Sequence, residues 1–108
     1  MFARLFQGEF LSRSSTAYLI DILKSTNTFP TRLKGALPPG TVVAHKTGSD
    51  GPVNGWTAAT NDSGVIFLPN GEQYAISVYV KASTRNDAER DGVIAQAALV
   101  AFEEFKAI

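Results

Sequence analysis

The stretch DSGVIFLPNGEQYAISVYV, residues 62–80, decides the fold. Residues 62–68 are rich in branched and aromatic side chains, and small or polar residues alternate with branched apolar ones over 74–80, which is typical of strands. Pro69–Glu72, between them, contains a proline and an Asn-Gly pair, which favour a tight reversal of the chain. The stretch therefore predicts an antiparallel hairpin with strands at 62–68 and 74–80, and periodicity places Tyr79, like Tyr18 upstream, in the core or at its boundary.

A third strand is predicted upstream of the hairpin. Residues 41–47 begin with β-branched side chains and are followed by Gly48, as in a strand that ends at a turn. The residues before this strand, 26–40, contain three prolines and two glycines, and regular elements do not tolerate so many breakers. We expect 26–40 to be a connecting loop.

Helices are predicted on both sides of the strands. Residues 12–25 form an amphipathic helix with Ser12 as N-cap, and residues 2–6 resemble the tail of another helix. A final helix begins near Asn86 and ends at about Lys106, with acidic residues in its first turn as the helix dipole favours. Gly92, inside this helix, is interpreted as the mark of a close approach to the sheet.

These elements predict a fold of the α+β (α/β) class, a three-stranded antiparallel sheet flanked by helices. A chain of 108 residues is the size of one domain, of which 44% is apolar and 19% charged. Because no stretch approaches the roughly 18 apolar residues of a membrane-spanning helix, we expect a soluble globular protein without a membrane partner.

Composition also excludes several kinds of site. Ten basic residues balance ten acidic ones, so a nucleic-acid partner is not favoured. The chain has no cysteine, which excludes disulfides and thiolate metal sites, and its single histidine excludes a histidine cluster. We expect no metal and no cofactor, and residues 1–6 do not read as a secretory signal.

Functional groups are concentrated at the end of the first strand, in the sequence Lys46-Thr47-Gly48-Ser49. Lysine supplies a fixed charge, the hydroxyls can bind polar ligands, and glycine allows close approach. A tripeptide such as Lys-Thr-Gly is weak by itself, since a lysine at a strand end is most often a solvated surface residue. Its context must therefore carry the interpretation.

That context is LPPGTVVAHKTG, residues 37–48, and AATNDSGVIFLPNG, residues 58–71. Together they resemble the C-terminal part of class A serine β-lactamases, with the likeness closest to the branch that contains the PER and VEB enzymes, and the resemblance covers nearly the whole chain. It implies the C-terminal part of the β-lactamase and penicillin-binding transpeptidase-like fold. It also implies β-lactam hydrolysis, antibiotic resistance, and a periplasmic or secreted protein.

Two other signatures of that family, Ser-x-x-Lys and Ser-Asp-Asn, are absent, as is a Glu-x-x-Leu-Asn segment for the deacylating glutamate. We therefore expect residues 1–108 to be a single partial domain that lacks an N-terminal segment with the nucleophile and is inactive by itself. Its partner would be that segment or another copy of the chain. The alternative function is a non-catalytic remnant or interaction module.

The resemblance assigns roles to the residues that are present. Lys46 would supply catalytic charge near the nucleophile and the substrate carboxylate, and the backbone N–H of Ser49 would be one half of the oxyanion hole. Thr47 would donate its hydroxyl to the carboxylate of the β-lactam, assisted by the Ser49 hydroxyl. Gly48 would let the substrate approach closely.

Other residues have alternative interpretations. Many family members carry a carboxylate-binding arginine where this chain has Ser63, and Arg32 could replace it from the loop; otherwise Arg32 is a solvated surface residue. His45 alternates with Lys46, so we expect it on the opposite face, structural and hydrogen-bonded beneath the site. Trp56 could line the edge of the cleft, but packing is the more frequent role.

Overall fold

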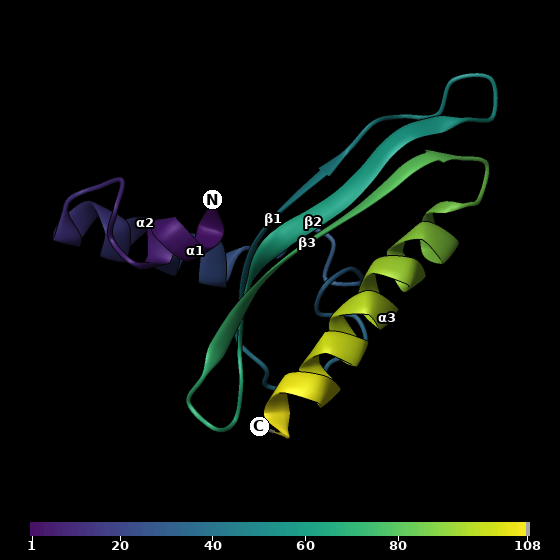
Figure 1. Ribbon diagram of the computed structural model, residues 1–108. Coiled ribbons are helices and arrows are strands. Elements are labelled where there is room, and N and C mark those ends of the chain that lie inside the picture. The colour runs from purple at the N-terminus through teal and green to yellow at the C-terminus, as the bar shows by residue number, and fades with distance from the viewer. Residues whose placement is uncertain (108) are drawn as a thin grey trace.

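The computed structural model describes residues 1–107 and confirms the predicted fold class (Figure 1). Its elements, in chain order, are α1 (Phe2–Phe6), α2 (Arg13–Ser25), β1 (Val43–Ser49), β2 (Thr57–Phe67), β3 (Gln73–Ser83) and α3 (Asp87–Lys106). The three strands form one antiparallel sheet in the order β1-β2-β3. Among the described residues, no helix is long and apolar enough to cross a membrane.

The hairpin predicted at 62–80 is the β2–β3 pair, and its turn is built as the sequence indicates. The Asn70 side chain accepts the N–H of Glu72 at 2.9 Å, and Gly71 has a φ of 88°, which glycine adopts without strain. Both strands are longer than predicted, because pairing extends to Thr57↔Ser83. Pairing also carries β1 through Gly48 to Ser49, where sequence alone indicated a strand end.

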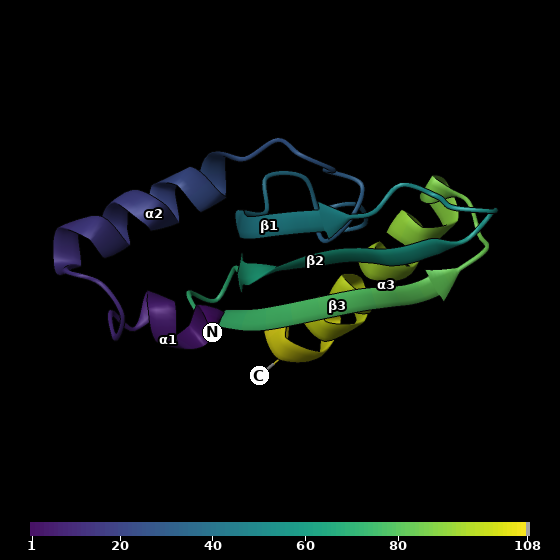
Figure 2. The same cartoon turned by 90° about the horizontal axis from the view of Figure 1, so that it is seen from above.

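One face of the sheet is covered by α3, which runs along it in both views (Figures 1 and 2). The apolar core lies between them, and β3 places every second side chain, from Tyr74 to Val80, against it. The fully buried members of this core come from the 26–40 loop, the sheet and α3: Leu33, Val43, Ile66, Ile94, Ala98 and Phe102.

The opposite face is covered only at one end. There α1 and α2 lie beside the start of β1 and the end of β2, and a small core forms around Leu5, Leu23 and Ala44 (Figures 1 and 2). Along β3 the side chains on this face, including Ser77 and Tyr79, are exposed. The placement of Tyr79 and Tyr18 in the core or at its boundary is wrong, since 68% and 71% of their surfaces are accessible.

The helix caps agree with the sequence. The Ser12 hydroxyl accepts the N–H of Ser15 at 3.2 Å, and the Asn86 side chain accepts the N–H of Glu89 at 2.8 Å. The interpretation of Gly92 is wrong, because a Cβ added there would meet no atom within 4 Å. Close approach occurs instead at Gly35 in the 26–40 loop, where a Cβ would lie 3.0 Å from the side chain of Ala95 on α3.

Tyr74 joins β3 to α3 by a hydrogen bond. Its hydroxyl donates to the carbonyl of Ala98 at 3.1 Å, and its ring centroid lies 5.0 Å from that of Phe105. Burial raises the pKa of Tyr74 from 10.0 to about 12. Only the folded state disfavours the phenolate. The contribution of the neutral Tyr74 side chain to the free energy of unfolding is therefore complete below pH 10 and is lost as the pH rises towards 12.

We predict that Tyr74→Phe weakens this pH dependence. The free energy of unfolding of the unmodified chain should fall between pH 10 and 12, and that of the variant should fall less. Below pH 10 the variant should be less stable by about 1 kcal/mol, the usual net value of one hydrogen bond. Urea unfolding over the pH series measures both effects, with the exposed Tyr79→Phe as control. An equally steep fall in Tyr74→Phe would contradict the assignment.

Candidate functional site

Three polar residues form a row across the sheet on its open face. Lys46 of β1 lies opposite Ser63 of β2, which lies opposite Ser77 of β3. Residues paired in this way share a face, so the Lys46 ammonium stands on the side that α3 does not cover. The Lys46 side chain is exposed, and its ammonium donates a hydrogen bond to the carbonyl of Thr47.

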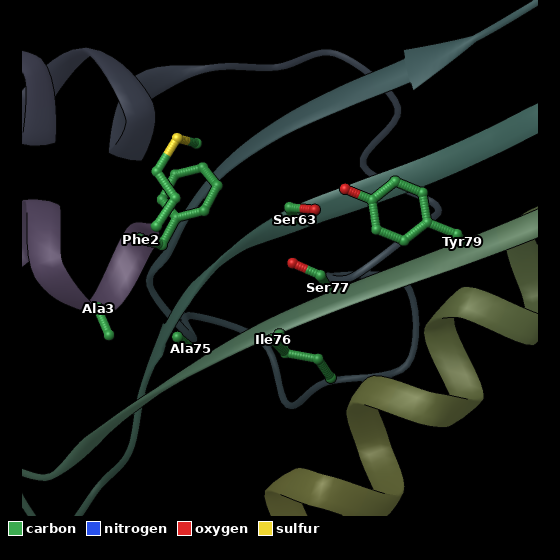
Figure 3. Close-up of a pocket in the computed structure, with 8 residues that line it drawn as sticks. Phe2, Ala3, Ser63, Ala75, Ile76, Ser77 and Tyr79 are labelled. Atoms are coloured by element: carbon green, nitrogen blue, oxygen red, sulfur yellow. The ribbon is translucent and has the colours of Figure 1, made fainter.

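A pocket of about 350 Å³ opens on this face between the N-terminus of α1 and β3. Figure 3 shows the hydroxyls of Ser63, Ser77 and Tyr79 gathered in it, beside Phe2 of α1. The Ser63 Oγ is buried and has no hydrogen-bond partner among the described residues. Such an atom is an unused donor and acceptor at the floor of the pocket.

Beneath β1, on the α3 side, His45 and Asp62 form a pair with no exposed surface. The Nδ1 of His45 lies 2.9 Å from both carboxylate oxygens of Asp62, and Nδ1 therefore carries the proton. Gly64, opposite His45, leaves room for this arrangement, since a Cβ there would lie 2.9 Å from the His45 Cβ. The predicted placement of His45, on the face opposite Lys46 and hydrogen-bonded beneath the site, is confirmed, and its structural role stays a prediction.

Thr47 lies on the same face as His45, not on that of Lys46. It is 6% exposed, and its hydroxyl is 3.2 Å from the hydroxyl of Thr28 in the loop after α2. The structure therefore divides Lys46 and Thr47 between the two faces of β1. A ligand that contacts both must lie along the free edge of the strand.

The backbone of Ser49 points towards that edge. The N–H of Asp50 donates to the carbonyl of Ala59 across the sheet at 3.0 Å. Successive N–H groups of a strand point to opposite sides, so the N–H of Ser49 points away from β2. No strand pairs with β1 on this side among residues 1–107, so that N–H faces outward.

Gly48 is constrained from within the sheet. A Cβ on Gly48 would lie 2.9 Å from the side-chain oxygen of Asn61, its partner on β2. The room that glycine leaves is thus taken by the Asn61 amide, and the approach of a substrate to Gly48 stays a prediction.

Arg32 is not the solvated surface residue of the alternative interpretation. It is 3% exposed, and its Nε donates to Asp91 of α3 at 2.8 Å. Its Nη1 donates to the carbonyls of Gly48 and Asn61, at 3.2 and 3.1 Å. Nε and Nη1 are therefore engaged within the protein, and the contact of Arg32 with a substrate carboxylate stays a prediction.

Sequence reasoning missed four residues around this site: Thr28, Asn61, Asp62 and Asp91. No local spacing joins them to their partners, which are 13 to 59 residues away in the chain. Trp56 departs from its predicted packing role, since it is 55% exposed beyond the end of β1. No group of three or more histidine, aspartate or glutamate side chains that could hold a metal ion occurs within residues 1–107.

Comparison with known proteins identifies relatives along nearly the whole chain. The model of the beta-lactamase enzyme family matches residues 1–105. The extended-spectrum β-lactamase PER-1 of Pseudomonas aeruginosa is 48% identical over 93 residues, which are 86% of this chain. The β-lactamase VEB-1 of the same species is 41% identical over 99 residues, which are 92% of this chain.

A solved structure is also similar. The crystal structure of the TLA-1 extended-spectrum β-lactamase superposes with a TM-score of 0.95 at 43% identity and covers 97% of this chain. The shared part is only 38% of the TLA-1 chain, 30% of PER-1 and 33% of VEB-1. The chain therefore spans about a third of the length of the relatives that it matches.

We predict that Asp62→Ala destabilises the fold severely. The variant leaves His45 buried without its partner and removes the acceptor of the Leu33 N–H, which lies 3.2 Å from Asp62 Oδ2. Breaking a buried pair of this kind costs about 3–5 kcal/mol. Denaturant unfolding measures the loss, and Glu89→Ala, which breaks an exposed pair with Arg85, should cost at most about 1 kcal/mol. Equal losses would contradict the role of Asp62.

Proposed function

Because the chain belongs to the beta-lactamase enzyme family, we propose that it is the C-terminal part of a class A serine enzyme that hydrolyses β-lactams. The observation that carries the proposal is the free edge of β1, where the Lys46 ammonium and the outward N–H of Ser49 lie within one strand end. The edge offers a cation and a backbone donor to one ligand, as acyl transfer to a serine requires.

Each group has a distinct task in this reaction. When a serine oxygen attacks the lactam carbonyl, the carbonyl oxygen gains negative charge, and the Ser49 N–H would stabilise it as one of two oxyanion donors. Lys46 would add positive charge next to the nucleophile and the substrate carboxylate. Thr47 would donate its hydroxyl to that carboxylate, after exchange of its contact with Thr28. The lactam C–N bond then breaks as its nitrogen takes the proton that the serine hydroxyl has lost, and attack by water on the resulting acyl-serine ester frees the serine and completes hydrolysis.

The nucleophile is not among the residues of this chain. No lysine has a serine three positions before it, as the Ser-x-x-Lys signature requires. We propose that the serine, its lysine and the water-activating glutamate belong to an N-terminal segment, and that the whole protein works in the periplasm or outside the cell. The 30–38% share of the relatives' lengths is consistent with a partial chain.

A second observation bears on partners. Among residues 1–107, β3 pairs with β2 only, so its outer edge is unpaired over the whole strand. An unpaired edge with alternating apolar side chains is a template for another strand. We propose that this edge receives a strand of the N-terminal segment or, when that segment is absent, of a second copy. The alternative function, a non-catalytic interaction module, depends on the same edge.

The catalytic proposal predicts that the chain alone does not hydrolyse a chromogenic cephalosporin, whereas the chain joined to the remainder of a PER-1-like protein does. In the joined protein, Lys46→Ala and Thr47→Ala should lower kcat/KM by about 2–4 kcal/mol of transition-state stabilisation each. The control is Arg85→Ala, whose side chain is exposed and pairs with the exposed Glu89 of α3.

Two results would contradict this prediction. Hydrolysis by the pure 108-residue chain that disappears in Lys46→Ala would show that the chain has its own nucleophile. Losses in Lys46→Ala and Thr47→Ala no larger than in Arg85→Ala would show that the free edge of β1 is not the site.

The edge of β3 predicts that the isolated chain associates. Size-exclusion chromatography with light scattering over a concentration series should show dimers or larger species, and the amides along β3 should be protected from exchange in them. Addition of the N-terminal segment should dissociate these species because it competes for the same edge. A folded monomer at all concentrations, with outer β3 amides that exchange freely, would contradict the prediction.

A further inference from the structure

Arg32 is a buried cation that reaches the Gly48–Ser49 peptide from inside the protein. Its guanidinium is anchored by Asp91 of α3, and Asp91 is held in turn by the Thr31 hydroxyl at 2.7 Å. Another nitrogen of the guanidinium, Nη1, bridges β1 and β2 by donating to the carbonyls of Gly48 and Asn61. This interaction joins the loop, the sheet and the last helix at the functional end of β1.

The carbonyl of Gly48 and the N–H of Ser49 belong to the same peptide unit. The described chain has no cis peptide bond, so the two groups point in opposite directions. Pairing with Asn61 places the carbonyl on the β2 side, Arg32 adds a hydrogen bond that holds it there, and the N–H points out of the free edge. A hydrogen bond from a cation to the carbonyl also polarises the unit and makes its N–H a stronger donor.

We propose that Arg32 is a positioning residue that, together with Asp91, orients and polarises the Gly48–Ser49 peptide so that the Ser49 N–H becomes a preorganised oxyanion donor. The proposal rests on the proposed function, which supplies the oxyanion. It differs from the sequence-based prediction for Arg32, in which the guanidinium itself binds the substrate carboxylate. Here Arg32 acts through the backbone and needs no contact with substrate.

The chemistry of the site requires arginine. A guanidinium offers several donors in a fixed plane, so Nε can bind Asp91 while Nη1 binds two carbonyls. A lysine ammonium is a single point charge and cannot hold both ends of this bridge.

The guanidinium also lies 3.8 Å from the centroid of the Phe29 ring, and Phe29 has a left-handed φ of 45°, uncommon for a residue with a side chain.

The test is an NMR comparison of the labelled 108-residue chain with two conservative variants, Arg32→Lys and Asp91→Asn. Loss of the hydrogen bond to the Gly48 carbonyl should move the Gly48 carbonyl carbon and the Ser49 amide nitrogen upfield. The matched control is Tyr74→Phe, which loses one hydrogen bond at the other end of the sheet. Resonances that move no more than in this control, in both variants, would overturn the proposal.

Kinetics in the joined protein supply a second readout. Arg32→Lys should lower kcat by about tenfold and leave KM within about twofold, a smaller effect than removal of an oxyanion donor. The fall in kcat should be the same for a β-lactam and its carboxylate ester. A rise in KM confined to the free carboxylate, with kcat unchanged, would overturn the proposal in favour of direct carboxylate binding.

The two readouts separate this proposal from the proposed function. If the joined protein hydrolyses no β-lactam while the Gly48 and Ser49 resonances still follow Arg32, the proposed function fails and the coupling of Arg32 to the peptide stands. If the joined protein is active and Arg32→Lys changes neither the resonances nor kcat, the coupling fails and the proposed function stands.

Discussion

A single carboxylate without exposed surface, Asp62, ties β1, β2 and the loop before β1 together. It accepts the Nδ1–H of His45 from β1 and the backbone N–H of Leu33 from the loop, while its own backbone lies in the central strand. A buried carboxylate is tolerable only when its oxygens are satisfied, so strand, strand and loop must meet in this one arrangement. The register of β1 against β2, and with it the position of Lys46 and Ser49, depends on that requirement.

A second buried pair, Arg32–Asp91, also joins the loop to the rest of the fold, through the residue before Leu33. Asp62 receives the N–H of Leu33, and the neighbouring Arg32 reaches both α3 and the end of β1. The irregular loop is thus tied by consecutive residues to both buried carboxylates. This explains how a segment rich in proline and glycine, with no regular structure, can place a side chain accurately beneath a strand.

One face of the sheet is covered by α3, and the other face is largely uncovered. The α3 side is packed and contains both buried pairs, whereas the other side has apolar cover only where α1 and α2 lie. On the open side stand Lys46, the unpartnered Ser63 hydroxyl and Ser77, all in one row. The Lys46 side chain on this side is exposed, and no helix of residues 1–107 packs over it.

The sequence by itself determined the elements and marked the candidate site. Period-2 alternation, the Pro-Asn-Gly turn and the caps Ser12 and Asn86 are local signals, and each element formed where they indicated, with strand ends displaced only by the pairing that neighbours impose. The Lys-Thr-Gly-Ser stretch is likewise contiguous and could be read directly.

Only the tertiary structure decided which polar groups meet. Arg32 and Asp91 are 59 residues apart, and His45 and Asp62 are 17 apart on different strands, so no local pattern joins them. The division of Lys46 and Thr47 between two faces follows from alternation along the strand. The free edge along which one ligand can contact both residues exists because β1 is an edge strand of the described sheet. Buried charge pairing depends on desolvation, a property of the packed fold that a single chain segment does not have.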